Sequence, residues 1–305
     1  MFGLDHFDFQ SLWSPWFMIL MMLIIGLYFA MIGPLRHRFS GSAPVGIGKQ
    51  SLFVTGIILY YIAQGSPLYL LGHLMFSAHM VSMSLAYLIV PPLILLGLPV
   101  WFLRSLINLP AIKKMITFLT HPIFTLLLFN MLFSFYHFPM VFDYIMTHYF
   151  IHAVYFMALL AAAFLMWWTI VCPVPEMDRL SELKKMGFIF ANGVLLTPAC
   201  ALIIFANTTL YGTFSDPHTW ADALGYCVPA NTAFLIERFS GPEFFALVPP
   251  LEDQQLGGVI MKLIQEFVYG TILFFIFYKW YRRENPQDAV DPMPRERLTV
   301  LPSIR

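Results

Sequence analysis

The sequence predicts an all-α polytopic membrane protein with seven transmembrane helices, and three observations predict it. The chain of 305 residues is 59% hydrophobic and 11% charged, whereas an ordinary soluble domain is about 45–50% apolar and about 25% charged. Its mean hydropathy is +0.73. Its basic residues are almost confined to alternate connections between apolar segments. A chain this poor in charge must present most of its surface to lipid.

Charge and motif content exclude several functional classes. Lys and Arg together number 17, as do Asp and Glu, so the net charge is zero and a polybasic nucleic-acid binder is excluded. The three Cys form no Cys-x-x-Cys pair and no disulfide framework. The sequence has no phosphate loop, no Gly-x-Gly-x-x-Gly, no Ser nucleophile motif and no His-Glu-x-x-His. We therefore expect neither a nucleic-acid partner nor an enzyme.

Seven segments are apolar enough to be spans, given that about 20 apolar residues cross the hydrocarbon layer. They are 15–33, 51–65, 68–96, 117–137, 150–171, 187–206 and 257–281. The first lacks a preceding basic residue and a cleavage pattern, so we expect a permanent span rather than a signal peptide. The second is short and leads through 64–67 into the third, which predicts a tight helical hairpin. Pro91 and Pro92 should kink or close the third helix.

The distribution of basic residues predicts the orientation. Fifteen of the 17 fall on alternate connections, and the exceptions are Arg238 and Lys262. The positive-inside rule then places the N-terminus outside and the C-terminus inside. We expect one transmembrane domain over 1–285 with an outer loop at 207–256, followed by a cytoplasmic Pro-rich tail at 286–305. The apolar stretch Gly225–Ile236 is too short to span and should be interfacial or re-entrant.

Imidazoles and thioethers are the main polar chemistry left for the outer half of the spans. The His residues at that depth are His73, His79, His137, His148 and His152. Helical spacing puts His148 and His152 on one face, and likewise brings Met80 and Met83 to the faces of His73 and His79. Imidazole with thioether suits a soft ion such as Cu(I). These five His are therefore candidate copper ligands, with Met80 and Met83 as weaker ones, although each could also be an interfacial or packing residue.

Other intramembrane polar groups have mainly structural interpretations. Lys262 and Glu266 are spaced to form an ion pair, which could alternatively be a proton relay or a carboxylate near the metal. Cys200 is a further candidate ligand, although buried Cys is commonly inert. Glu252 and Asp253 should stabilise the start of the last helix through its dipole. A further group should form hydrogen bonds between helices: Asn130, Asn192, Thr197 and Gln265.

Several multi-residue stretches resemble the Bacillus-type CtaG family of cytochrome c oxidase assembly factors. These stretches are Leu12-Trp-Ser-Pro-Trp16, Gly65-Ser-Pro67, Gly72-His-Leu-Met-Phe-Ser-Ala-His-Met80, Phe118-Leu-Thr-His-Pro122, Asn192-Gly-Val-Leu-Leu-Thr-Pro-Ala-Cys200 and Leu251-Glu-Asp-Gln-Gln-Leu-Gly-Gly258. The resemblance covers nearly the whole chain. It implies a multi-pass protein of the bacterial plasma membrane that matures the oxidase, with copper delivery as the usual proposal, and it does not identify ligands. An unrelated single-span copper chaperone carries the same name, and this chain does not resemble it.

The leading hypothesis is an assembly factor that binds copper, as Cu(I), near the outer face and passes it to cytochrome c oxidase subunits by ligand exchange. One alternative is a haem-binding carrier or electron-transfer protein, because imidazoles from different helices could ligate haem iron. Another is a metal-free scaffold that contacts the oxidase through the outer loop. Membrane lipid is an expected partner, and a homo-oligomer is left open. The sequence does not reveal which helices are neighbours.

Overall fold

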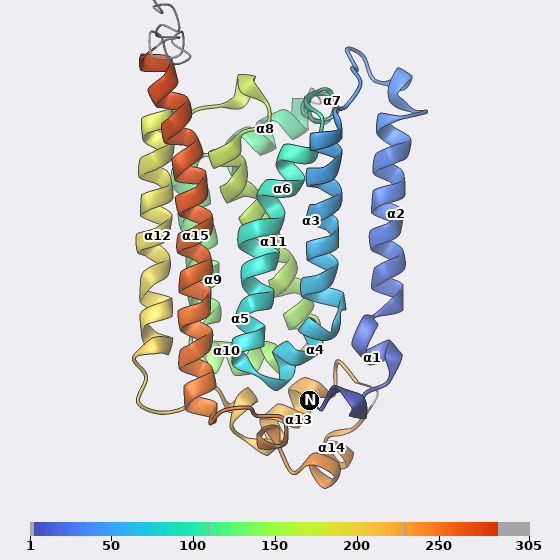
Figure 1. Ribbon diagram of the computed structural model, residues 1–305, viewed down its shortest axis with the longest axis vertical. Helices are drawn as coiled ribbons and strands as arrows, with labels where there is room; N and C mark the ends of the chain where they lie inside the picture. The colour runs from blue at the N-terminus through green and yellow to red at the C-terminus, as the bar shows by residue number, and fades with distance from the viewer. Residues whose placement is uncertain (1–2, 109, 229, 286–305) are drawn as a thin grey trace, which may run out of the picture.

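The computed structural model describes residues 3–108, 110–228 and 230–285, and within them the chain is helical without strands (Figure 1). The helices are α1 Phe9–Trp13, α2 Pro15–Ile32, α3 Ile47–Gly65, α4 Pro67–Leu74, α5 Phe76–Ser84, α6 Val90–Gly97, α7 Val100–Ile107, α8 Pro110–Leu119, α9 Pro122–Tyr136, α10 Pro139–Met146, α11 Tyr149–Val171, α12 Glu182–Ile204, α13 Pro217–Leu224, α14 Thr232–Phe239 and α15 Pro250–Glu284. The predicted tail, 286–305, lies outside the described residues.

Five long apolar helices and two bent helix pairs are long enough to cross a membrane, which makes seven spans when each pair counts as one. The pairs are α3 with α4, bent by 40°, and α8 with α9, bent by 68°. The predicted all-α polytopic class is confirmed. The N-terminal segment and the end of α15 lie at opposite ends of the bundle (Figure 1), as an odd number of spans requires. Following the basic residues, we call the end with the N-terminal segment the outer end.

The predicted single helix over 68–96 is wrong, because the chain reverses within it. Met75 is extended and separates α4 from α5. A Cβ added to Gly72 would lie 3.2 Å from the Cα of His79, whereas residues seven apart in one helix are about 10 Å apart. At the predicted turn, Ser66 and Pro67 instead start a new helix at a bend of 40°, and the Ser66 hydroxyl caps it by accepting from Leu68 N–H at 3.2 Å.

Pro91 and Pro92 do not close the third span, which continues to Gly97. A π-helical turn, Leu85–Ile89, precedes them. Pro91 has no N–H to offer the carbonyl of Tyr87, one turn earlier. The indole N–H of Trp167 on α11 donates to that carbonyl at 3.1 Å instead. An interhelical hydrogen bond thus replaces the intrahelical one, as a membrane-buried carbonyl requires.

Asp253 stabilises a helix other than its own. It lies in the first turn of α15, but its Oδ2 accepts from the N–H groups of Phe76 at 2.6 Å and Ser77 at 3.3 Å. The Ser77 hydroxyl also donates to this carboxylate. Asp253 therefore caps the start of α5, directly after the chain reversal. The expectation that it serves the dipole of α15 missed this contact.

The outer loop folds into a cap over the outer end of the bundle. Helices α13 and α14 lie beyond the ends of the spans (Figure 1), so Gly225–Ile236 does not re-enter where it is described. Trp220 of α13 is fully buried in a cluster with Leu70 and Leu74 of α4. The Asp143 carboxylate on α10 accepts from the N–H groups of Gly212 and Thr213, each at 2.9 Å. The cap is thus fixed to the bundle by apolar packing and hydrogen bonds.

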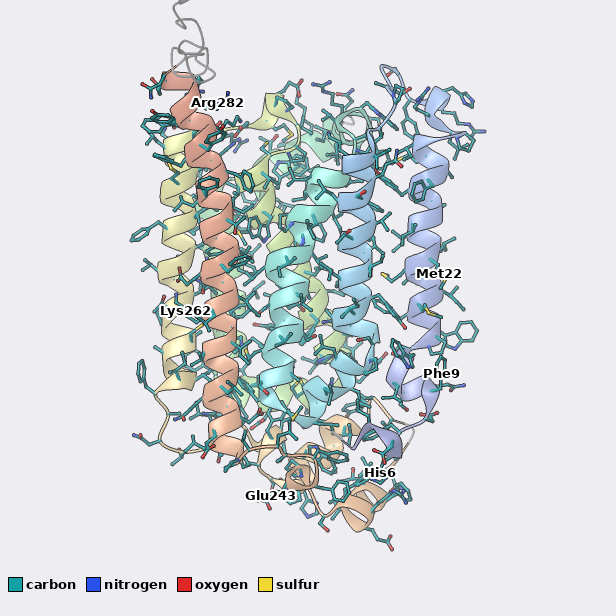
Figure 2. All side chains as sticks on the ribbon, viewed as in Figure 1. His6, Phe9, Met22, Glu243, Lys262 and Arg282 are labelled. Atoms are coloured by element: carbon teal, nitrogen blue, oxygen red, sulfur yellow. The ribbon has the colours of Figure 1, made fainter. Side chains whose placement is uncertain are left out.

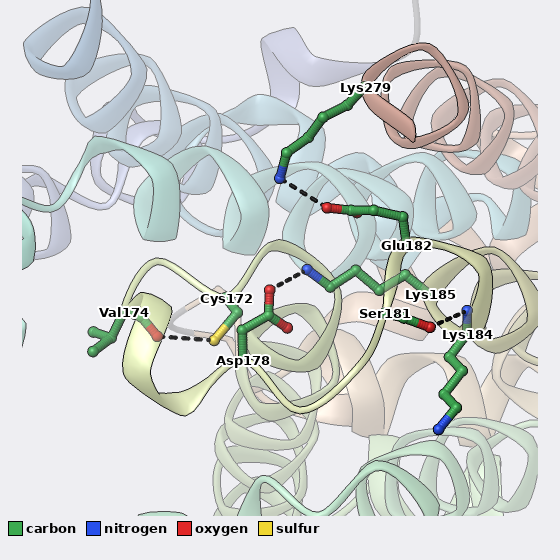
Figure 3. Close-up of polar contacts among 8 residues, drawn as sticks. All are labelled: Cys172, Val174, Asp178, Ser181, Glu182, Lys184, Lys185 and Lys279. Atoms are coloured by element: carbon green, nitrogen blue, oxygen red, sulfur yellow. Dashed lines mark hydrogen bonds and ion pairs between the residues drawn. The ribbon is translucent and has the colours of Figure 1, made fainter. Parts of the chain in front are cut away.

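Ion pairs hold the inner end together (Figure 3). Lys185 on α12 lies 2.6 Å from the Asp178 carboxylate in the preceding loop, and Lys279 on α15 lies 2.9 Å from Glu182. Ser181 caps the start of α12 by accepting from Lys184 N–H at 3.5 Å. The two antiparallel helices α12 and α15 are therefore joined near the inner end by charges rather than by apolar contact alone.

Candidate metal centre at the outer end

Four of the five candidate His residues come from four different helices that meet beneath the cap. His73 lies on α4, His79 on α5, His137 ends α9, and His152 lies in the first turn of α11. His73, His79 and His137 are buried, with exposed fractions of 3%, 4% and 0%. The reversal at Met75 is what brings His73 and His79 to the same region, since it folds α4 against α5.

His73 and His152 are neighbouring imidazoles. Their ring centroids are 6.1 Å apart, and their planes are inclined by 55°. His73 Nδ1 lies 3.1 Å from the carbonyl of Tyr69. Because a carbonyl only accepts, Nδ1 carries the proton and Nε2 keeps its lone pair. His152 Nε2 is buried and has no hydrogen-bond partner.

His137 is fixed in the same tautomer as His73. Its Nδ1 donates to the carbonyl of Phe133 at 2.7 Å, which leaves Nε2 as the lone-pair atom. That Nε2 is buried and has no partner. The His137 carbonyl accepts from the Tyr211 hydroxyl at 2.9 Å, so the cap helps to position this residue. An Nδ1–H donated to a backbone carbonyl is the usual way in which a protein orients a metal-binding imidazole.

His79 is linked to a thioether that the sequence did not single out. The hydroxyl of Tyr136 lies 3.0 Å from His79 Nε2 and 3.4 Å from the sulfur of Met146. Tyr136 also packs edge-on against His137, with ring centroids 5.2 Å apart. Tyr136 therefore stands between two candidate imidazoles and one thioether. Neither Tyr136 nor Met146 could be identified from helical spacing, because they lie on different helices from His79.

His148 lies apart from the other imidazoles. It is exposed and extended, and it is the N-cap of α11, where its carbonyl accepts from the His152 N–H at 2.8 Å. Its Nδ1 lies 2.7 Å from the carbonyl of Tyr144. It lines a surface pocket of about 770 Å³ under the cap, together with Asp143 and Asp222. The expected shared face of His148 and His152 is therefore not formed.

The predicted sulfur ligands are core residues. Met80 and Met83 are 0% and 1% exposed and pack within the main hydrophobic cluster of the bundle. Cys200 on α12 belongs to the same cluster and is 2% exposed. Within the described ranges, no group of three or more His, Cys, Asp or Glu side chains is placed to hold a metal ion. The pair His73 and His152 is the tightest imidazole arrangement that the described chain offers.

The remaining predicted polar contacts lie deeper in the bundle. Lys262 and Glu266 form the expected ion pair at 2.7 Å. The Asn130 amide on α9 donates to the Asn192 amide oxygen on α12 at 2.8 Å, which confirms an interhelical hydrogen bond. Gln265 is fully buried, and neither its amide nitrogen nor its oxygen has a partner. It does not make the interhelical bond expected of it.

Comparison with known proteins places the chain by its sequence. The family model described as cytochrome c oxidase caa3 assembly factor, Caa3_CtaG, matches residues 26–283. No match was found among curated proteins or among solved structures. The matched range includes all seven spans apart from the first part of α2, the four clustered imidazoles and the cap. The chain therefore belongs to the cytochrome c oxidase caa3 assembly factor family.

Proposed function

We propose that this assembly factor binds copper as Cu(I) between His73 and His152 at the outer end of the bundle and transfers it to the oxidase. The observation that carries the proposal is the neighbouring pair of imidazoles, with its buried and unpartnered nitrogen on His152. A buried polar atom without a partner costs free energy, so its presence calls for an explanation such as a bound ion. His79, His137, Met80, Met83 and Met146 are the further donors that the proposal considers.

The spacing of the two rings suits one ion. Two imidazoles that bind one ion from opposite sides have ring centroids roughly 6 Å apart, since each metal–nitrogen bond is about 2 Å and each ring adds its own radius. The centroids of His73 and His152 are 6.1 Å apart. Cu(I) accepts two nearly collinear ligands, whereas structural zinc takes four. A site with two principal imidazoles therefore favours Cu(I).

Transfer would proceed by ligand exchange. His137 and the Met146 sulfur lie around Tyr136, whose ring packs against Phe156, the ring that also packs against His152. Both are soft or neutral donors of the kind that Cu(I) accepts. A weak two-imidazole site releases its ion to a partner site that has more or softer ligands. The described role is transfer without covalent chemistry, and we expect no catalytic activity. Membership of an oxidase assembly factor family supports the choice of the oxidase as the recipient in this proposal.

Copper content and affinity of the purified chain test this proposal. We expect about one Cu(I) per wild-type chain in competition with a Cu(I) chelator, and an affinity at least about tenfold lower in His73→Ala/His152→Ala. The matched control is His148→Ala, which removes an exposed imidazole one turn away and should leave affinity unchanged. Absence of copper from wild type, or equal affinity in the double variant, would refute the proposal.

The two alternative functions give different results in the same preparation. Tyr69 packs against His73 and Phe156 against His152, with ring centroids 4.8 Å and 4.1 Å apart, which favours an ion over a macrocycle between the imidazoles. A Soret band in the purified protein would instead establish haem binding. A metal-free scaffold would assemble oxidase normally with both imidazoles removed and would fail when the cap is altered.

A further inference from the structure

We propose that a second copy of this chain docks within the membrane on the face formed by α12 and α15. The proposal starts from the Lys262–Glu266 pair, whose side chains are 27% and 60% exposed. Lys262 is twelve residues from the start of α15, which corresponds to about 18 Å of helix. Figure 2 shows it between the level of Glu243 at the outer end and that of Arg282 at the inner end. The proposed dimer does not depend on copper binding.

The charged ends of Lys262 and Glu266 remain at this depth and do not extend toward the membrane surface. The Lys262 ammonium donates to the Thr197 hydroxyl on α12 at 3.0 Å and lies 2.7 Å from the Glu266 carboxylate, one turn further inward. A lysine that faced only lipid would extend toward the nearer interface. Charges that are exposed at this depth are expensive in hydrocarbon. The arrangement therefore calls for a protein surface that covers it.

The pocket beside the ion pair includes a polar side chain without a hydrogen-bond partner, that of Tyr269. The pocket has a volume of about 220 Å³ and is lined by Thr197, Lys262, Glu266 and Tyr269 among others. The Tyr269 side chain is buried, with 4% of the residue exposed, and its hydroxyl has no partner. A Cβ added to Gly270 in the same wall would meet nothing within 4 Å. Another helix could therefore approach this wall closely at Gly270.

Charge complementarity identifies the occupant as a second copy. The face carries one cation and one anion about one helical turn apart, so it is complementary to itself. A two-fold axis along the membrane normal would place two α15 helices side by side and parallel, as in an isologous dimer. Lys262 of each copy then pairs with Glu266 of the other. Lipid headgroups do not reach this depth, and lipid tails offer no hydrogen bonds.

Reciprocal charge reversal tests this pairing in the full-length protein. Two differently tagged copies are co-expressed, solubilised in mild detergent and purified through one tag. Wild-type copies should co-purify. When both tagged copies carry Lys262→Glu, or both carry Glu266→Lys, we expect at least about threefold less co-purification than for two wild-type copies. This factor corresponds to a typical interhelical polar contact in a membrane. Lys262→Glu with Glu266→Lys should recover pairing, because every interchain contact is again between opposite charges.

This recovery separates pairing from folding. Each variant lacks its intrachain ion pair in every mixture, so only a contact between copies can produce the recovery. Lys279→Glu is the matched control, since it reverses a charge on the same helix at the inner end and should leave pairing unchanged. Wild-type copies that fail to co-purify, or mixed variants that pair no better than each alone, would overturn the proposal. Co-purification of an oxidase subunit in place of the second tagged copy would also overturn the proposed dimer.

Discussion

The two ends of the bundle solve the problem of polar groups in different ways. At the inner end the polar side chains are charged and paired, as in Lys185 with Asp178 and Lys279 with Glu182. Beneath the outer cap, imidazoles lie beside the Asp143 and Asp253 carboxylates, and two of the imidazole nitrogens are buried without a partner. A structural role is sufficient to account for such paired charges. Buried imidazole nitrogens without a partner call for an explanation such as a bound ligand, and those of His137 and His152 lie at the outer end, which points there for function.

The largest expected effect is at the outer end, where Asp253→Ala removes the cap of α5. The variant leaves the Phe76 and Ser77 N–H groups without their partner, and we expect a loss of about 3 kcal/mol of stability, since hydrogen bonds to a charged group each contribute about 1.5–3 kcal/mol. Thermal unfolding in detergent measures it. Glu252→Ala, an exposed carboxylate in the same turn, is the control. Equal losses in both variants would mean that Asp253 acts through the dipole of α15.

Copper should stabilise the protein through the outer end alone. A ligand at 100 times its dissociation constant stabilises the folded state by about 2.7 kcal/mol. We expect Cu(I) to raise the midpoint of thermal unfolding in wild type and in Lys185→Met, and to leave His73→Ala/His152→Ala unchanged. A copper-dependent shift that disappears with the inner-end variant and persists in the imidazole variant would reverse the assignment of the two ends.

Breaking the buried inner ion pair should have a smaller effect. The side chain of Lys185 is 5% exposed and that of Asp178 is 29% exposed. Lys185→Met strands a carboxylate that water can still reach in part, so we expect a loss of about 1–2 kcal/mol, below the cost for a fully buried pair. Denaturation of this variant is compared with Lys184→Met, which removes an exposed neighbouring charge. Copper affinity should be the same in both, and a reduced affinity in Lys185→Met would contradict the independence of the two ends.

The smallest effect is expected from Arg104→Ala at the inner surface. Its guanidinium forms an ion pair with Glu176 and holds the pKa of that carboxyl below its ordinary value of 4.5. A lowered folded-state pKa contributes stability above the ordinary pKa, and this contribution is lost as the pH falls through the lowered value. Both side chains are exposed, so we expect no measurable change at neutral pH. A clear loss of stability at pH 7 would show that surface charge does more at this end than its exposure implies.

Local sequence patterns predicted the helices well and their neighbours poorly. Apolar length identified the spans, and helical spacing predicted the Lys262–Glu266 pair, because both depend on residues within one helix. The cap on Phe76 comes from Asp253, 177 positions away, and no periodicity reveals such a contact.

The same limit applied to the candidate site. His73 and His152 were both singled out as imidazoles at one depth, but their contact depends on the reversal at Met75. His148 was grouped with them by its helical spacing to His152, whereas its Nδ1 lies 2.7 Å from the carbonyl of Tyr144 on α10. Met146 and Tyr136 enter the site only because α9 and α10 fold back toward α5.

X-ray absorption spectroscopy of the copper-loaded, detergent-purified chain tests the central claim most directly. We expect Cu(I) with two imidazole nitrogens as its main ligands at about 2 Å, as for other first-row metal–imidazole bonds. The spectrum should be unchanged in His148→Ala and should lose imidazole scattering in His152→Ala. A copper ion bound mainly by oxygen ligands, or a spectrum that changes in His148→Ala and not in His152→Ala, would contradict it.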